Sequence, residues 1–93
     1  MIGPKQAADY PDRDIDCQEA VSQAVAELIE QASLSGRASA DAAAEIADTG
    51  VPGVREIIDA ASEAGWSREE TENAIKEVAA GMYRGFTGTE RDE

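Results

Sequence analysis

The 93-residue sequence contains no histidine and only one cysteine, Cys17. Without histidine, the chain lacks the side chain that most often acts as a general acid or base near neutral pH. A single cysteine excludes an intrachain disulfide, and no cysteine–histidine cluster exists to bind zinc. The sequence also has no glycine-rich phosphate loop and no serine in a nucleophile motif. We therefore predict that the protein is not an enzyme and uses no cofactor or metal.

One acidic segment resembles the beginning of a calcium-binding loop. Asp12, Asp14 and Asp16 alternate in the required way, but the sixth position is Cys17 in place of glycine, and the twelfth is Gln23 in place of glutamate. We interpret these acids as the start of a helix, where Asp14 or Asp16 caps free backbone N–H groups and complements the helix dipole.

Large apolar residues are scarce. The chain has one Trp, two Tyr and one Phe, and 18 of its hydrophobic residues are alanine. Apolar burial contributes about 25 cal/mol per Å², against roughly 1.5 kcal/mol of entropy lost per ordered residue, so such a domain is marginally stable alone. No apolar run has the length of a membrane span, and the amino-terminal residues lack a signal-peptide core. We expect a soluble, cytoplasmic protein that gains stability from a partner or a second copy.

Basic residues are also few, since 8 Lys and Arg face 20 Asp and Glu, which gives a net charge of −12. Direct binding to nucleic acid is disfavoured because phosphate contacts require clustered cations. An acidic surface is instead attracted to basic surfaces, such as those of DNA-binding proteins. The sequence leaves open the alternative that the acidity serves only solubility in a bacterial cytoplasm.

Hydrophobic periodicity predicts an all-α domain, a compact bundle of four short helices with a flexible N-terminal arm and a polar, disordered C-terminal tail. The expected ranges are 1–13 for the arm, 14–86 for the single helical domain and 87–93 for the tail. Within the domain, helices are expected near 15–34, 40–48, 52–64 and 68–83. Gly81, Gly85 and Gly88 are expected to prevent further helix near the carboxyl end of the chain.

The third and fourth helices meet at Gly65-Trp66. Glycine at this position allows the left-handed conformation that ends a helix, and Ser67 with Glu70 matches a capping box that starts the next one. We expect the first helix to pack against this corner. Trp66 has two interpretations, as a core residue or as an anchor for a partner protein.

The first helix has the clearest pattern in the sequence. Its apolar residues recur at helical spacing, whereas Glu19, Glu27 and Glu30 occupy other faces. This helix is a candidate both for the core and for an acidic docking face, and the sequence does not show which side is buried. Tyr83 and Phe86 either wrap the core or form an exposed aromatic patch. The candidate partner-binding residues are therefore Glu19, Glu27, Glu30, Trp66, Tyr83 and Phe86.

The sequence leaves open two alternatives from other functional classes. The second and third predicted helices are spaced like a DNA-binding helix-turn-helix, but the third offers Arg55 among Glu56, Asp59 and Glu63 and would repel phosphate. A self-associating structural adaptor, such as a homodimer, is also consistent with a small core.

Two resemblances add to this interpretation. Gly65-Trp66, Ser67-Arg-Glu-Glu70 and Ala74-Ile75 resemble the first two helices of a ubiquitin-associated-type domain, although the third helix is missing. That resemblance implies a compact corner with an aromatic residue used for protein binding. Over the whole chain, the size, the acidity and the segment from Ser39 to Gly53 resemble the QseM-type antiactivators of rhizobial mobile elements. This second resemblance implies binding to a transcriptional activator of quorum sensing and conjugative transfer.

The function we predict is non-enzymatic regulation through protein–protein binding, with an acidic antiactivator sequestering a transcriptional activator. The expected partner carries a basic or apolar docking surface. No membrane contact and no direct nucleic-acid contact are expected.

Overall fold

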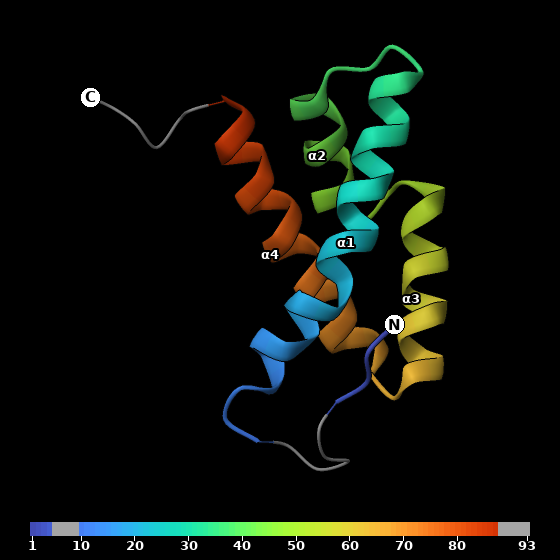
Figure 1. The fold of residues 1–93 in the computed structure, drawn as a ribbon, viewed down its shortest axis with the longest axis vertical. Helices are drawn as coiled ribbons and strands as arrows, with labels where there is room; N and C mark the ends of the chain where they lie inside the picture. The colour runs from blue at the N-terminus through green and yellow to red at the C-terminus, as the bar shows by residue number, and fades with distance from the viewer. Residues whose placement is uncertain (5–9, 88–93) are drawn as a thin grey trace, which may run out of the picture.

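The computed structural model describes residues 1–4 and 10–87, and within these ranges it contains helices but no strand (Figure 1). The four helices are α1 (Arg13–Leu34), α2 (Ser39–Ala47), α3 (Pro52–Ala64) and α4 (Arg68–Thr87). The predicted all-α bundle of four helices is confirmed. Among the described helices, none has the length and apolar character needed to cross a membrane. Part of the predicted arm and nearly all of the predicted tail lie outside the described residues.

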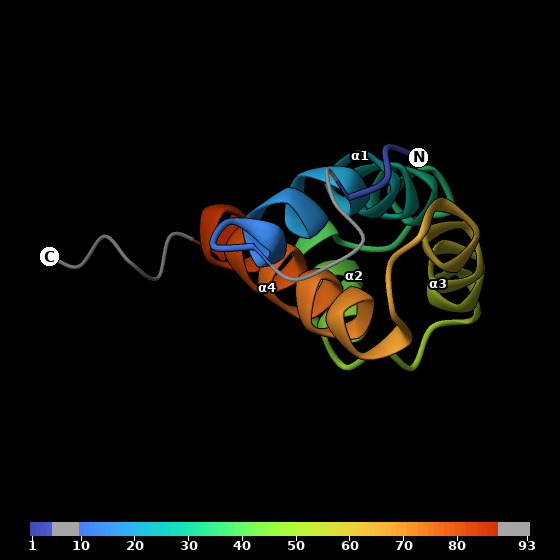
Figure 2. The ribbon, with the colours of Figure 1, turned by 90° about the horizontal axis from the view of Figure 1, so that it is seen from below.

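Helix α1 contacts each of the other three helices (Figures 1 and 2). Its buried residues, Cys17, Val21, Val25 and Ile29, recur every four positions and therefore lie on one side of the helix. The structure thus decides which side of this helix is buried. The apolar stripe faces the core, and the opposite side is left to solvent.

The most extensive pairing is between α2 and α4, which are not neighbours along the chain. The buried residues of α2 are Ala42, Ala43 and Ile46, and its small alanine side chains allow close approach of a second helix. Contacts of α1 with both α3 and α4 agree with the expected packing against their corner. The α2–α4 pairing was not predicted, because a short alanine-rich stripe does not specify its partner.

The α3–α4 corner has the predicted local form. Gly65 adopts φ +113°, in the left-handed region, and the Trp66 N–H donates to the Ala61 carbonyl at 3.0 Å. The Glu70 N–H donates to Ser67 Oγ at 3.1 Å, while the Ser67 N–H donates to Glu70 Oε2 at 2.6 Å. These two bonds form the capping box expected from the sequence.

The structure corrects the expected end of the fourth helix. Helix α4 continues through Gly85 to Thr87, beyond the end expected near residue 83. Glycine lowers helix stability by about 1 kcal/mol without forbidding helical dihedrals, and Val78 and Met82 still pack on the core. At the start of α2, Ser39 is the first helical residue, and its Oγ lies 2.9 Å from Ser33 Oγ.

The first four residues lie against the α3–α4 corner. The indole Nε1 of Trp66 donates to the Ile2 carbonyl at 2.9 Å. At Gly3, an added Cβ would lie 2.3 Å from the Ala64 carbonyl oxygen, so no larger residue fits without movement. This segment belongs to the arm expected to be flexible, yet the described part of it covers the corner.

Thr49, which follows α2, has φ +56°, and we expect its replacement to stabilise the protein. A β-branched residue is strained in the left-handed region, and glycine is not. Thr49→Gly should therefore raise the free energy of unfolding by up to about 1 kcal/mol, even after glycine's greater flexibility in the unfolded chain is counted. Urea denaturation measures the change. Thr49→Ala keeps the left-handed penalty, so an equal gain in this control would contradict the strain explanation.

Candidate functional site

The three glutamates proposed for docking lie on the solvent side of α1. Glu19, Glu27 and Glu30 are all exposed. A helix rises 1.5 Å and turns 100° per residue, which separates Glu19 from Glu30 by about 16 Å along the axis and by only about 20° around it. Glu27 lies roughly 80° from Glu19 around the axis. The three carboxylates therefore share one side of the helix, opposite Val21 and Val25.

These carboxylates have little structural role within the described residues. Glu27 Oε2 accepts a hydrogen bond from Gln23 Nε2 at 3.3 Å, an exposed contact one helical turn away. Ser22 Oγ donates to the backbone carbonyl of Glu19, and among the described residues no hydrogen bond or ion pair involves the Glu19 carboxylate. A partner with a basic surface would consequently meet carboxylates that the fold does not need.

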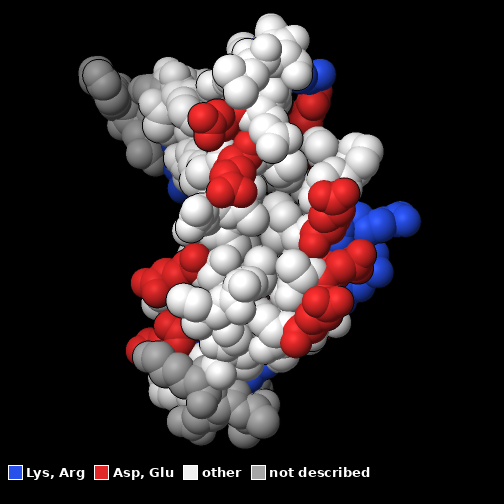
Figure 3. All heavy atoms as spheres, turned by 45° about the vertical axis from the view of Figure 1, so that its right-hand side comes forward, with Lys and Arg blue, Asp and Glu red and all other residues white. Residues whose placement is uncertain are grey.

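A second acidic stripe was not included among the sequence candidates. Glu56, Asp59 and Glu63 are exposed on α3, at spacings of three and four residues that place them on one side of the helix. This acidic stripe could have been found in the sequence, because the helical spacing that identified the apolar side of α3 also places these three acids together. On the face shown in Figure 3, acidic side chains form several separate groups, and the most prominent basic group lies at one edge.

Trp66 is a core residue. Its exposure is only 3%, and the Arg13 guanidinium lies 5.3 Å from the centre of its ring. Of the two interpretations drawn from the sequence, the structure therefore supports the core one. With its ring covered and its N–H bonded to Ile2, Trp66 offers no surface to a partner in this conformation, and we remove it from the candidate contacts.

Tyr83 and Phe86 are partly open to solvent at the carboxyl end of α4, with exposures of 38% and 50%. Their spacing of three residues places them on neighbouring positions of the helix surface. The apolar stripe of α4 thus extends beyond the region that the other helices cover. Ile15 and Leu34, at the two ends of α1, are exposed by 51% and 82% and were not singled out from the sequence.

A polar cluster joins the start of α1 to the α3–α4 corner. Arg13 Nε donates to Glu70 Oε1 at 2.8 Å, and a terminal guanidinium nitrogen donates to Oε2 at 2.9 Å. Both side chains are mostly buried, at 12% and 21% exposure. Hydrogen bonding from Arg13 is the main cause that lowers the pKa of Glu70 below its ordinary value of 4.5. No local sequence signal connects residues 57 positions apart, so this pair was missed.

Cys17 lies beside this cluster and is fully buried. Its burial, reinforced by the negative charge of Glu70, raises the pKa of the thiol from 9.0 to about 11. The thiol is therefore protonated at neutral pH, which agrees with the packing role expected for it. Across residues 1–4 and 10–87, no group of three or more Cys, Asp or Glu side chains is arranged to hold a metal ion.

The resemblances drawn from the sequence concern the α3–α4 corner and the general character of the chain. The corner has the geometry expected where one helix ends at a glycine and a capping box starts the next. This geometry concerns local structure only and does not indicate a function. Comparisons with models of protein families, with curated proteins and with solved structures find no match, so both resemblances remain predictions.

Proposed function

We propose that the protein is a non-enzymatic regulator that binds another protein through the acidic side of α1. The observation that carries this proposal is the exposure of Glu19, Glu27 and Glu30 on one side of a helix whose other side forms the core. Because the core side fixes the orientation of α1, its carboxylates are presented on a preformed surface, and binding requires no ordering of the helix.

The chemistry of this surface selects the partner. A protein of net charge −12 is attracted to basic surfaces and is repelled by nucleic acid. Transcriptional regulators carry such basic surfaces where they contact DNA. A partner held there by Glu19, Glu27 and Glu30 is kept from its DNA, which is the action of an antiactivator. The QseM-type resemblance supports the same function, with quorum sensing and conjugative transfer as the controlled processes.

The acidic side of α3 does not favour the DNA-binding alternative, because Glu56, Asp59 and Glu63 are exposed on the helix that would enter the groove. A homodimer through Tyr83 and Phe86 is a second route to a non-enzymatic role, favoured by their partial exposure. It predicts a mass that rises with concentration in the absence of any other protein.

The test uses tagged protein to recover partners from cells of its own host, followed by titration of the purified regulator. We expect Glu19→Lys/Glu27→Lys/Glu30→Lys to weaken regulator binding roughly tenfold or more, since three charge pairs of about 0.2–1 kcal/mol are lost and replaced by repulsion. Binding of the unmodified protein should also weaken as salt is raised, because the contacts are exposed.

The matched control is Glu56→Lys/Asp59→Lys/Glu63→Lys, which changes the net charge by the same amount on α3. Regulator binding should fall much less in this control. Equal losses in both variants would mean that overall charge, and not the α1 surface, determines binding. Unchanged binding in the α1 variant would remove these glutamates from the interface, and recovery of the protein's own chain alone would favour the homodimer.

A further inference from the structure

Residues 1–4 contact the α3–α4 corner closely, and the amino terminus lies beside α3 (Figure 1). The Ile2 carbonyl accepts the indole N–H of Trp66 at 2.9 Å. At Gly3, an added Cβ would lie 2.3 Å from the Ala64 carbonyl oxygen, a separation that real Cβ atoms do not adopt. The corner therefore holds this segment by one directional hydrogen bond and by a backbone approach that only glycine permits.

The side chains of the same segment contribute unequally. The Pro4 ring packs beside Gly65, since a Cβ added to that glycine would lie 3.2 Å from Pro4 Cδ. The Ile2 side chain, in contrast, is 80% exposed. The corner thus contacts a carbonyl group, then a glycine, then a proline ring, and it places no requirement on the side chain that precedes the glycine.

The charges at the corner favour an uncharged occupant. Arg13 lies 5.3 Å from the centre of the Trp66 ring, and both carboxylate oxygens of Glu70 accept hydrogen bonds from its guanidinium. This ion pair is neutral as a unit. Residues 2–4, which occupy the corner, have no charged side chain.

A segment of another protein can make the same contacts, because none of them needs a covalent link to the corner. An indole N–H that is held away from water is costly to leave without an acceptor, so the corner favours a carbonyl at this place. We infer that the α3–α4 corner is a docking site for an uncharged peptide segment with the pattern x-Gly-Pro, where x is any residue, and that residues 1–4 occupy it as an internal competitor. The site involves none of the glutamates of α1 and goes beyond the proposed function.

The test begins by displacing the internal competitor. Trp66 is the only tryptophan, so ¹⁵N-labelled protein gives a single indole N–H signal in heteronuclear NMR. Gly3→Ala should displace residues 1–4, because the added methyl group meets a backbone oxygen. We expect the Trp66 signal to move and its exchange with water to accelerate roughly fivefold or more, as an ordinary hydrogen bond is lost. Gly50→Ala is the matched control and should leave the signal in place, since no described atom lies within 4 Å of a Cβ added there.

The probe is the neutral peptide acetyl-Met-Ile-Gly-Pro-amide, titrated into the Gly3→Ala protein. We expect it to return the Trp66 signal toward its position in the unmodified protein, with saturation at a millimolar Kd. In the unmodified protein, residues 1–4 compete at an effective concentration in the millimolar range, so the same peptide should have little effect there.

Two further peptides test which groups are recognised. Acetyl-Met-Ile-Ala-Pro-amide should bind at least about tenfold more weakly, because its methyl group meets the Ala64 carbonyl. Acetyl-Met-Ser-Gly-Pro-amide should bind within about twofold of the first peptide, because the side chain at this position is exposed.

An unmoved Trp66 signal in the Gly3→Ala protein would overturn the assignment, because close approach of the glycine would then not hold residues 1–4. Equal binding of the glycine and alanine peptides, or no response to either, would overturn it as well.

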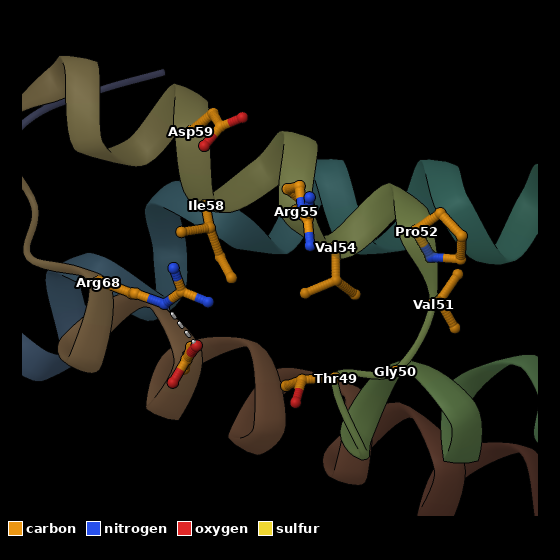
Figure 4. A pocket seen from close by; sticks show the side chains of 10 residues that line it. Thr49, Gly50, Val51, Pro52, Val54, Arg55, Ile58, Asp59 and Arg68 are labelled. Carbon is orange, nitrogen blue, oxygen red and sulfur yellow. Dashed lines mark hydrogen bonds and ion pairs between the residues drawn. The ribbon is translucent and has the colours of Figure 1, made fainter.

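The nearest alternative location for a peptide is a cleft of about 810 Å³ between α3 and the start of α4 (Figure 4). Its lining includes Arg55, Asp59, Arg68 and Glu72, whose opposite charges balance and favour no charged ligand. Peptide-induced shifts confined to backbone amides of this cleft would place binding there and contradict the assignment to the corner.

Discussion

Replacing Trp66 with alanine is expected to lower the free energy of unfolding by about 3–5 kcal/mol, the usual cost of removing a large buried aromatic side chain. Trp66 is 3% exposed, and its loss would also leave the Ile2 carbonyl without its donor and remove the ring beneath Arg13. A domain of this size has a total stability of roughly 5–10 kcal/mol. The variant should therefore be partly or wholly unfolded at moderate temperature.

Urea denaturation followed by far-ultraviolet circular dichroism is the suitable measurement, because the change removes the only tryptophan as a fluorescent probe. Phe86→Ala is the matched control, since Phe86 is half exposed on α4 and its loss should cost less than about 1 kcal/mol. Trp66→Phe keeps most of the side-chain volume, and its loss in free energy of unfolding should lie between those of Trp66→Ala and Phe86→Ala. A fully stable Trp66→Ala protein would contradict the core assignment and restore this residue as a docking candidate.

Replacing Glu70 with alanine is expected to cost about 2–3 kcal/mol. Glu70 accepts two hydrogen bonds from Arg13 and one from the Ser67 N–H, so one substitution removes the capping box and two charge-assisted hydrogen bonds to a mostly buried guanidinium. The remaining exposure of both side chains keeps the cost below that of a fully buried pair. Chemical denaturation measures the loss.

Glu72→Ala provides the control on the same helix. Its partner Arg68 is 76% exposed, and pairs of this kind contribute about 0–1 kcal/mol. A cost for Glu70→Ala no greater than that of the control would show that the Arg13–Glu70 pair does not stabilise the link between α1 and the corner.

The same carboxylate makes stability depend on pH. The folded-state pKa of Glu70 lies below the ordinary value of 4.5. The ionised carboxylate therefore contributes fully to the free energy of unfolding above pH 4.5, and this contribution is lost as the pH falls through the lowered folded-state pKa. Glu70→Gln should remove this contribution. The stability difference between the two proteins should accordingly narrow as the pH is lowered below 4.5, and a difference that stays constant in acid would exclude this linkage.

Local features of the fold were accessible from the sequence. Gly65 at the end of α3 and the Ser67–Glu70 capping box act through neighbouring backbone groups, so their positions along the chain determine the corner. The apolar stripe of Val21, Val25 and Ile29 was recognisable from its helical spacing, but the structure decided that this side of α1 is the buried one and that Glu19, Glu27 and Glu30 lie on the exposed side.

The tertiary structure alone decided how the helices combine. The α2–α4 pairing, the Arg13–Glu70 ion pair and the Ile2–Trp66 hydrogen bond join residues far apart in sequence, and no periodic pattern specifies such contacts. The burial of Trp66, the partial exposure of Tyr83 and Phe86 and the cleft containing Arg55 all result from that packing. The sequence by itself determined the helices and their corner, because hydrogen bonds within a few residues control them. The tertiary structure decided which surfaces remain open to a ligand, because exposure depends on which distant segments pack together.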